Sequence, residues 1–308
     1  MTTRPLAKPL RPLARFSALA ALAAVALAAP LAVGCASSSS PAGSSDPAAN
    51  ADAGSTAPLQ RRIVAIGDTH GTLAATRAAL KLAGAIDDQD RWVGGPELTV
   101  VQTGDQIDRG DDDREVLDLF DRLKREGNVI PLVGNHEILN AEGDYARYTT
   151  PTADAAFADL GGRTAAFAPG GPYAKMLATR PVILSLEGNV FVHGGVLPKH
   201  VTYGVERINE ETKTWLESGG REPAFLTASD APVWTRLYSQ DPNAAACATL
   251  DEALKALGAK RMIVGHTVQD AGIVSACGGK AWLIDVGMVF GGKPEALEII
   301  GDDVRVVR

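Results

Sequence analysis

The chain has 308 residues, enough for one large domain or two small ones, and its apolar content of 45% is that of an ordinary globular protein. The net charge is -7, and removing the four positive charges of residues 1–34 from this total leaves -11. An acidic domain lacks the positive surface of a general DNA or RNA binder, so no nucleic-acid partner is expected. Phosphate substrates remain compatible with this charge, because bound metal ions can reverse the local field.

Residues 1–35 have the features of an export signal, because a basic segment precedes an apolar run over residues 18–31. A membrane-spanning helix is the alternative, but the run is short, is interrupted by Pro30 and consists mostly of small residues. The run ends in LAVGC, which resembles a bacterial lipoprotein cleavage box with a lipid on Cys35, although Ala32 stands where leucine is usual. An ordinary cleavage site with a chance cysteine is the alternative there.

The segment 36–58 contains Ala, Ser, Pro, Gly and Asp with almost no large apolar residue. Such a segment cannot offset its ordering entropy, so a disordered tether is expected, followed by a folded domain at 59–308. The protein is therefore predicted to be exported to the periplasm or the extracellular space. If Cys35 carries a lipid, the tether would hold the domain at the outer membrane.

Three apolar runs near the start of this domain each end in a glycine turn with polar side chains. Helical periodicity over 73–82 and 115–125 separates them, which predicts a βαβαβ unit with parallel strands. Ligands bind at the carboxyl ends of strands in open α/β sheets, so the three turns should converge. The runs and their turns are 63–66 before GDTHG (67–71), 98–101 before GDQIDRG (104–110), and 129–133 before GNHE (134–137).

The remainder of the chain reads as a second sheet with covering helices. Residues 140–180 are rich in Pro and Gly and predict short helices and loops near the site. Two further strands end in HGG and in GH. A hairpin is expected at 181–186 and 189–192, helices at 205–217 and 250–257, and strands at 261–264, 281–286, 296–300 and 304–307.

Six side chains at these strand ends are candidate metal ligands. Their donors are oxygen and nitrogen without sulfur, a set that suits Zn, Mn or Fe. Six ligands are too many for one tetrahedral ion but fit two ions that share a carboxylate, and such a pair can activate water for phosphoryl displacement. The six residues are Asp68, His70, Asp105, Asn135, His193 and His266.

The set GDxHG, GDxxDRG, GNHE, HGG and a late GH resembles the calcineurin-like metallophosphoesterases, and within them the phosphoprotein phosphatase group. The NAEGD continuation after GNHE and VWTR at 233–236 are most similar to the bacterial-type Shewanella-like branch. The resemblance covers about residues 61–290. It implies an α/β fold in which two packed mixed sheets are flanked by helices, an α/β/β/α sandwich, over the domain 59–308.

The same resemblance implies a role for each motif residue. Asp68, His70 and Asp105 match ligands of a first metal, and Asp105, Asn135, His193 and His266 match ligands of a second. His136 matches the general acid and Asp108 its carboxylate partner, while Arg109 matches a phosphate clamp assisted by Asn135. A second clamp is assigned to Arg236, with Arg207 as the alternative, because no tight motif marks this position.

The function that follows is hydrolysis of phosphomonoesters, with phosphoproteins (Ser/Thr or Tyr) as the expected substrates. A bis(nucleosyl) tetraphosphatase-type nucleotide phosphohydrolase shares most of the motifs and is the first alternative. A catalytically silent, exported binding protein on the same fold is the second. The intact DRG after Asp105 and the presence of Glu137 favour the phosphatase.

Other features are given structural interpretations. His200 matches no motif and is expected on the surface. The acidic clusters 87–90 and 111–113 are expected to be solvated loop charges and helix caps rather than calcium sites. The four tryptophans are expected in the core or at its rim. Cys247 and Cys277 form a disulfide or remain two free thiols, and the sequence leaves both open.

Overall fold

The computed structural model describes residues 61–308. The expected signal segment 1–35 with Cys35, the tether 36–58 and the first residues of the expected domain lie outside the described residues. Two five-stranded sheets form the centre of the described part. Among residues 61–308, no helix combines the length and the apolar character that a bilayer crossing requires.

The first sheet contains the βαβαβ unit predicted from the apolar periodicity. Its strand order is β10-β9-β1-β2-β3, and β1 pairs in parallel with β2, as β2 does with β3. Helices α1 and α2 make the two crossovers, and the antiparallel pair β9–β10 extends the sheet beside β1. The elements are β1 (Arg62–Ile66), α1 (Leu73–Leu82), β2 (Leu98–Gln102), α2 (Asp113–Glu126), β3 (Val129–Pro131), β9 (Ala296–Ile300) and β10 (Asp303–Val307).

The second sheet has the strand order β4-β5-β6-β8-β7, in which β5, β6 and β8 are parallel. Its side chains alternate between two cores, as the pleat of a strand requires. Val190 and Val192 of β5 pack in one core, whereas Phe191 between them packs in the core that contains β1. The strands are β4 (Ile183–Leu186), β5 (Asn189–Val192), β6 (Arg261–Val264), β7 (Val274–Ala276) and β8 (Ala281–Leu283).

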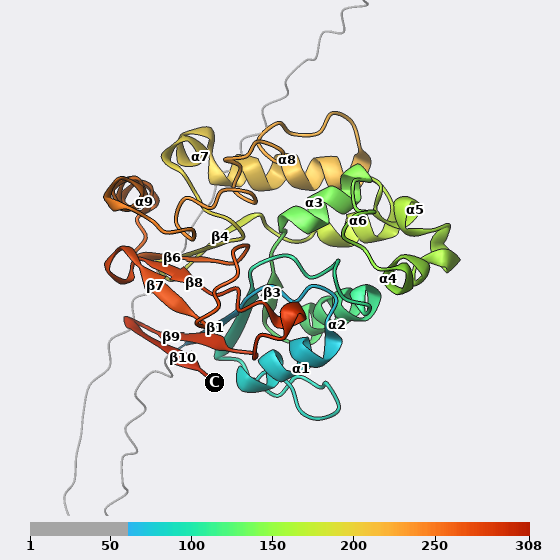
Figure 1. The fold of residues 1–308 in the computed structure, drawn as a ribbon, viewed down its shortest axis with the longest axis horizontal. Helices are drawn as coiled ribbons and strands as arrows, with labels where there is room; N and C mark the ends of the chain where they lie inside the picture. Colours follow the sequence, from blue (N-terminus) through green and yellow to red (C-terminus); the bar gives the residue numbers. More distant parts are fainter. Residues whose placement is uncertain (1–60) are drawn as a thin grey trace, which may run out of the picture. The chain divides into compact units, whose positions relative to one another are not determined.

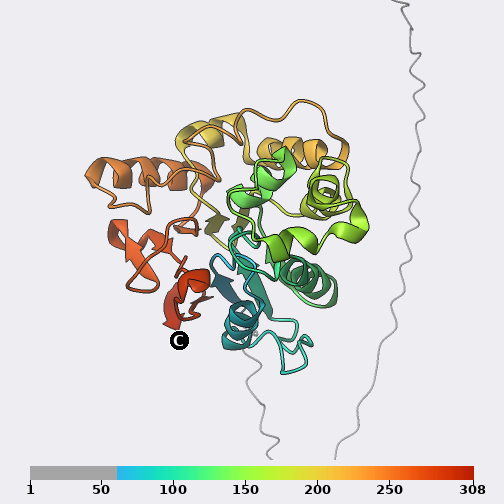
Figure 2. The same ribbon diagram turned by 45° about the vertical axis from the view of Figure 1, so that its right-hand side comes forward.

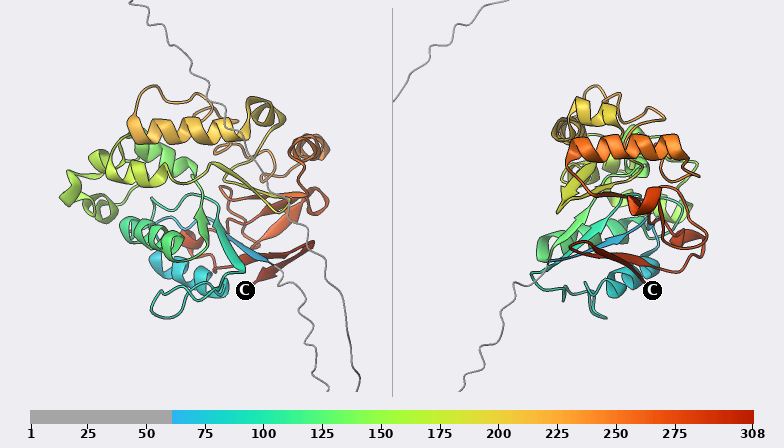
Figure 3. Two further views of the ribbon diagram at one scale, coloured as in Figure 1. Left: turned by 180° about the vertical axis from the view of Figure 1, so that it is seen from behind. Right: turned by 90° about the vertical axis from the view of Figure 1, so that its left-hand side faces the viewer.

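Helices cover the outer faces of both sheets, so the predicted α/β/β/α sandwich is confirmed. Leu80 of α1 and Phe120 of α2 are buried in the core of the first sheet, and Leu250 and Leu254 of α9 in that of the second. Figure 1 shows α7 and α8 above the strands and α1 below them. The right-hand view of Figure 3 shows α9 on one side of the sheets and the β9–β10 pair on the far side. The helices of the second layer are α7 (Pro198–Tyr203), α8 (Val205–Ser218) and α9 (Ala244–Leu257).

A group of short helices, called the helical cover below, occupies the segment from 135 to 180. The short helices predicted for residues 140–180 are present there. Figure 2 shows the helical cover on the opposite side of the domain from α9. The apolar side chains Phe157, Phe167 and Tyr173 pack edge to face or stacked within it. The helices are α3 (Asn135–Glu142), α4 (Pro151–Ala155), α5 (Arg163–Phe167) and α6 (Pro172–Leu177).

Two expectations about single elements are corrected by local hydrogen bonds. Helix α9 begins at Ala244 rather than at residue 250, because the side chain of Asn243 caps its first turn by accepting from Ala246 N. The expectation that His200 lies on the surface is wrong, since the residue is only 4% exposed. Its ring folds back over the start of α7, where Nδ1 accepts a hydrogen bond from Leu197 N.

The two cysteines of the described domain are joined. Cys247 in α9 forms a disulfide with Cys277, which follows β7, across a sequence separation of 30 residues. The bond ties the outer helix layer to the edge of the second sheet. This resolves the alternative between a disulfide and two free thiols that the sequence leaves open.

Candidate active site

The turns after five strands meet at one place between the two sheets. The site residues follow β1, β2 and β3 of the first sheet, and β5 and β6 of the second. Two groups of donors each lie with their ligand atoms within 4.8 Å of one another, and Asp105 belongs to both. The groups are His70, Asp105 and His136, and Asp105, His193 and His266.

The backbone of these turns is shaped so that carboxylates can lie against it. A Cβ at Gly134 would approach Asp105 Oδ1 to 2.2 Å, and a Cβ at Gly265 would approach Asp68 Oδ1 to the same distance. Only glycine fits at these two positions. His70, Asp105 and His266 themselves have positive φ values of 43°, 55° and 67°. Backbone strain of this kind persists where the surrounding structure holds it, and it is common at functional sites.

Each of three histidines has one ring nitrogen engaged by a backbone carbonyl, which leaves the other free for a ligand. Nδ1 of His70 lies 2.9 Å from Ile107 O, and Nδ1 of His193 lies 2.9 Å from Thr103 O. His266 uses the opposite nitrogen, because its Nε2 lies 3.1 Å from Trp234 O. Metal-bound histidines typically donate their second N–H in this way, which fixes the tautomer and aims the lone pair.

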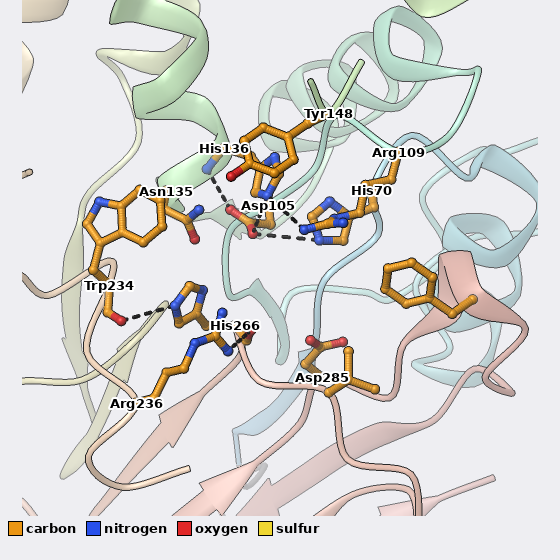
Figure 4. A pocket seen from close by; sticks show the side chains of 12 residues that line it. His70, Asp105, Arg109, Asn135, His136, Tyr148, Trp234, Arg236, His266 and Asp285 are labelled. Atoms are coloured by element: carbon orange, nitrogen blue, oxygen red, sulfur yellow. Dashed lines mark hydrogen bonds and ion pairs between the residues drawn. The ribbon is translucent and has the colours of Figure 1, made fainter. Parts of the chain in front are cut away.

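The free nitrogens face one another and the Asp105 carboxylate. His193 Nε2 lies 3.1 Å from Asp105 Oδ2, 2.9 Å from Asn135 Oδ1 and 3.1 Å from His266 Nδ1. Asp105 Oδ2 lies 3.7 Å from His70 Nε2, so this oxygen stands between the two groups of donors. Figure 4 shows Asp105 between Asn135 and His70, with His136 above it and His266 below it. Donors converging on a shared carboxylate suit two metal ions.

The pKa shifts of the site residues are those expected of groups that bind a cation. Burial lowers the pKa of His70 to about 4, and burial with the nearby His193 lowers that of His266 to about 2, so both rings stay neutral as metal ligands must. Burial, Asp285 and Asp105 together raise the pKa of Asp68 well above its usual value. Burial opposes ionisation of Asp105 too, but His193 and His136 outweigh it and lower its pKa. Several buried carboxylates together require compensation by positive charge.

Asp285 is a site residue that motif reasoning missed. It is buried, lines the pocket, and contributes to the raised pKa of Asp68. Its Oδ1 accepts a hydrogen bond from Gly287 N at 2.9 Å. The run IDVG at 284–287 places an aspartate shortly after β8 with a glycine two residues later, whereas a glycine precedes the aspartate in GDTHG and GDQIDRG. An aspartate at the end of an apolar run and close to a glycine is the signal that could have identified it.

His136 differs from the other histidines of the site, because its environment favours the protonated ring. Its Nδ1 lies 2.7 Å from Asp108 Oδ2. Burial opposes protonation, but Asp105 and the bond to Asp108 outweigh it and raise the pKa of His136. The ring packs edge to face with Tyr148, at 4.8 Å between centroids. A protonated imidazole cannot bind a metal ion but can donate a proton.

Two arginines enter the pocket from opposite sides, as Figure 4 shows. The guanidinium of Arg109 stacks on Tyr148 and Phe290, with Cζ 5.4 and 5.5 Å from their ring centroids. Arg236 is held by its Nη1, which donates to His266 O at 2.7 Å and to Thr267 Oγ1 at 2.8 Å. Arg207 instead pairs with Glu211 on the exposed face of α8 and does not line this pocket. Of the two candidate clamps, only Arg236 is brought to the site.

The pocket between these side chains has a volume of about 200 Å³. Polar donors form its floor, and Trp234 and Val268 contribute to its apolar wall. Phe290 stands at the rim with 63% of its surface exposed. The lining residues are His70, Asp105, Arg109, Asn135, His136, Tyr148, Trp234, Arg236, His266, Val268, Asp285 and Phe290.

The expectation that the 111–113 cluster is solvated is wrong for Asp113, which is fully buried. Its Oδ1 accepts from Asp108 N at 2.9 Å, and its Oδ2 lies 2.7 Å from the guanidinium of Arg163. Burial raises the pKa of Asp113 to about 7, and the charge of Arg163 opposes that rise. Arg163 itself has no motif and was not found from the sequence.

Comparison with known proteins agrees with the site. The family model described as calcineurin-like phosphoesterase matches residues 61–270. The chain is 41% identical to Shewanella-like protein phosphatase 2 of Arabidopsis thaliana, over 80% of this chain and 77% of that protein. It is 30% identical to Shewanella-like protein phosphatase 1 of Plasmodium berghei, over 74% of this chain and 67% of that protein.

A solved structure shares the fold. The cold-active protein-tyrosine phosphatase of a psychrophilic Shewanella species superposes with a TM-score of 0.69 at 22% identity, over 81% of each chain. The resemblance stated from the motifs is thereby confirmed, and so is the expectation of an enzyme of the metallophosphoesterase class. From its motifs, its fold and its relatives, this chain belongs to the calcineurin-like phosphoesterase family.

Proposed function

We propose that this protein is a dinuclear metal-dependent phosphatase that hydrolyses phosphomonoesters, with phosphorylated proteins as its substrate class. The observation that carries the proposal is the position of Asp105, whose Oδ2 lies 3.7 Å from His70 Nε2 and 3.1 Å from His193 Nε2, while Asp68 Oδ2 lies 4.0 Å from His70 Nε2. Asp68, His70 and Asp105 would hold one ion, and Asp105, Asn135, His193 and His266 the other. Oxygen and nitrogen donors without sulfur suit Mn, Fe or Zn. When bound, two such ions supply a water nucleophile at neutral pH and neutralise charge on the phosphoryl group.

The protein's own side chains perform the remaining tasks. His136 donates its proton from Nε2 to the departing oxygen, and Asp108 orients the ring through Nδ1. Arg109 and Arg236 bind phosphoryl oxygens from opposite sides of the pocket, where negative charge spreads in the transition state. Asn135 faces the same space and can contact the phosphoryl group as well.

The size of the pocket supports a phosphomonoester rather than a dinucleoside polyphosphate. A pocket of about 200 Å³ is smaller than the ~300–1,000 Å³ that enclose a drug-sized ligand. It fits a phosphoryl group and the first atoms of its leaving group, while the rest of the substrate lies outside. The exposed Phe290 and Val268 at the rim offer an apolar surface to that outer part.

A substrate panel tests the proposal. The full chain, reconstituted with Mn, Fe or Zn, is assayed on phosphoserine and phosphotyrosine peptides, on p-nitrophenyl phosphate, and on diadenosine tetraphosphate. We expect turnover of the monoesters and a peptide preference over the dinucleotide. Preferential cleavage of diadenosine tetraphosphate would support the nucleotide phosphohydrolase instead. Binding of phosphopeptides without any turnover would support a silent binding protein.

We also propose that the protein is exported and held at a membrane by a lipid on Cys35. The basic and apolar start of the chain supports this, and so does the Cys247–Cys277 disulfide, because such bonds persist mainly in oxidising compartments. Labelling of cells with an alkyne palmitate should mark the wild type but not a Cys35→Ser variant. Unlabelled wild-type protein in the cytosolic fraction would contradict the proposal.

A further inference from the structure

The helical cover carries one arginine whose charge is fully buried. Arg163 is the first residue of α5, and its side chain is 0% exposed. Phe157 and Phe167 flank the guanidinium, with their ring centroids 5.3 and 5.2 Å from Cζ. These rings exclude water from the charge. Burying an arginine is costly, and an internal ion pair is weak evidence for a gain in stability. The contacts of Arg163 therefore indicate that it positions the groups around it.

Every nitrogen of the guanidinium is engaged within the protein. Nη2 lies 2.8 Å from Asp108 Oδ1 and 2.7 Å from Asp113 Oδ2. Nε donates to Asn140 Oδ1 at 2.7 Å, and Nη1 donates to Ala153 O at 3.3 Å. Arg163 does not line the substrate pocket. It therefore differs from Arg109 and Arg236, which face that pocket, and can act on the reaction only through its partners.

The partners of Arg163 are the groups that hold His136. The two oxygens of Asp108 are divided: Oδ1 is bound by Arg163 and Thr149, and Oδ2 by His136 and Asn140. Asn140 Nδ2 lies 3.0 Å from Asp108 Oδ2 and 2.9 Å from His136 O. The Arg163 guanidinium thus fixes both the Asp108 carboxylate and the Asn140 amide, and both of these groups contact His136. Without it, the Asp108 carboxylate could rotate away from His136.

We propose that Arg163 is a positioning residue for His136, an inference that rests on the proposed function. By fixing Asp108 and Asn140, it keeps His136 Nε2 aimed at the oxygen that leaves phosphorus. Misplacement of a reacting group by about 1 Å can cost roughly 10²-fold in rate. Arg163 of the helical cover therefore contributes to catalysis without touching the substrate.

Leaving-group dependence distinguishes this role from general support of the fold. Kinetics are measured for wild type and Arg163→Met on aryl phosphates whose leaving groups range from 2,4-dinitrophenol to phenol, and on phosphoserine peptide. We expect kcat to fall about 10- to 100-fold on phenyl phosphate and phosphoserine, but less than about threefold on the dinitrophenyl ester, which needs little protonation. Equal losses on all esters would overturn the proposal.

The chain offers a matched control. Arg261 is another buried arginine, at the start of β6 and bonded to Asp302 O at the opposite end of the strand from His266. Arg261→Met removes the same chemical group from a buried position. We expect any change it causes in kcat to be the same for every ester, because it touches none of the groups that hold His136.

A double mutant shows whether Arg163 acts through His136. In a His136→Asn background, adding Arg163→Met should change kcat on phenyl phosphate by less than about twofold, because residues that act as a unit are non-additive. If the losses in kcat of the two single variants multiplied in the double variant, the proposal would be overturned. Should Arg163→Met fail to fold, Arg163→Lys serves in the same series, since one ammonium cannot reproduce the fork that holds both Asp108 and Asn140. A wild type inactive on every ester would instead overturn the proposed function itself.

Discussion

The strand-end turns and the helical cover contribute to the same site in different ways. The turns present one or two donors each, shortly after a strand and beside a glycine, and four of these donors (His70, Asp105, Asn135 and His266) line the pocket. Arg163 of the cover lies inside a buried network that reaches the pocket through Asp108 and His136. In the proposed mechanism, the turns therefore supply the metal ligands, and Arg163 of the cover fixes the position of the proton donor.

The largest effect is expected from the centre of the turns. Asp105→Asn keeps the shape of the side chain but removes the charge shared by both donor groups. We expect loss of bound metal and a fall in kcat/KM of about 10³-fold or more, because metal ions contribute several kcal/mol of charge stabilisation. Elemental analysis and kinetics measure both. Asp88→Asn, at an exposed loop carboxylate, serves as the control, and full metal content in Asp105→Asn would refute the shared-ligand role.

The next largest effect lies where the turns and the cover meet. His136→Asn should retain the metal ions and lose about 10²- to 10⁴-fold in kcat on alkyl phosphates, the usual contribution of general acid catalysis. The loss on p-nitrophenyl phosphate should be much smaller, because its leaving group is acidic. Parallel assays on the two classes of ester test this. If His136→Asn lost metal along with activity, His136 would be a ligand and not the acid.

A smaller effect should separate the two candidate clamps. Arg236→Met removes a donor that faces the pocket, and we expect kcat/KM to fall about 10²-fold, as for the loss of one preorganised donor. Arg207→Met makes the same change on the exposed face of α8, where the arginine pairs with Glu211. We expect this matched control to stay within about twofold of wild type. The reverse order of effects would assign the clamp to Arg207.

The smallest effect concerns the pH dependence of stability at the far end of α3, the helix that begins with Asn135 and His136. Partial desolvation and the neighbouring carboxyl groups of Glu222 and Asp144 raise the pKa of Glu142 to about 8, from an ordinary value of 4.5. Between these values the folded protein holds a proton that the unfolded chain releases, so the stability contributed by this proton is lost as pH rises from 4.5 to 8.

Glu142→Gln should remove this dependence. Its melting temperature should exceed that of wild type at pH 8.5 and approach it at pH 5. Glu206→Gln, at an exposed position on α8, provides the control. It should shift the melting temperature equally at pH 5 and at pH 8.5. If the melting temperature of Glu142→Gln differed between pH 5 and pH 8.5 by as much as that of wild type, Glu142 would not be the source of the pH dependence.

The sequence motifs identified the donors of the turns but not the contacts of Arg163 in the cover, for physical reasons. Strands β1, β2 and β3 end in local motifs, and parallel strands share an edge, so their convergence could be expected. Asp285 also follows a strand and lies near a glycine, but no longer motif surrounds it. Arg163 meets Asp108 across 55 positions, a separation that leaves no local spacing to detect. His200 is buried, and its ring accepts a hydrogen bond at the start of its own helix, a contact that an isolated histidine in the sequence does not reveal.

Anomalous diffraction tests the central claim most directly. Crystals of the metal-reconstituted protein, with data collected at the absorption edge of the added metal, should show two peaks about 3.5–4 Å apart. Asp105 should lie between the peaks, with His70 beside one and His193 and His266 beside the other. A single peak, or peaks remote from Asp105, in crystals of fully active enzyme would contradict a shared two-metal centre at these strand ends.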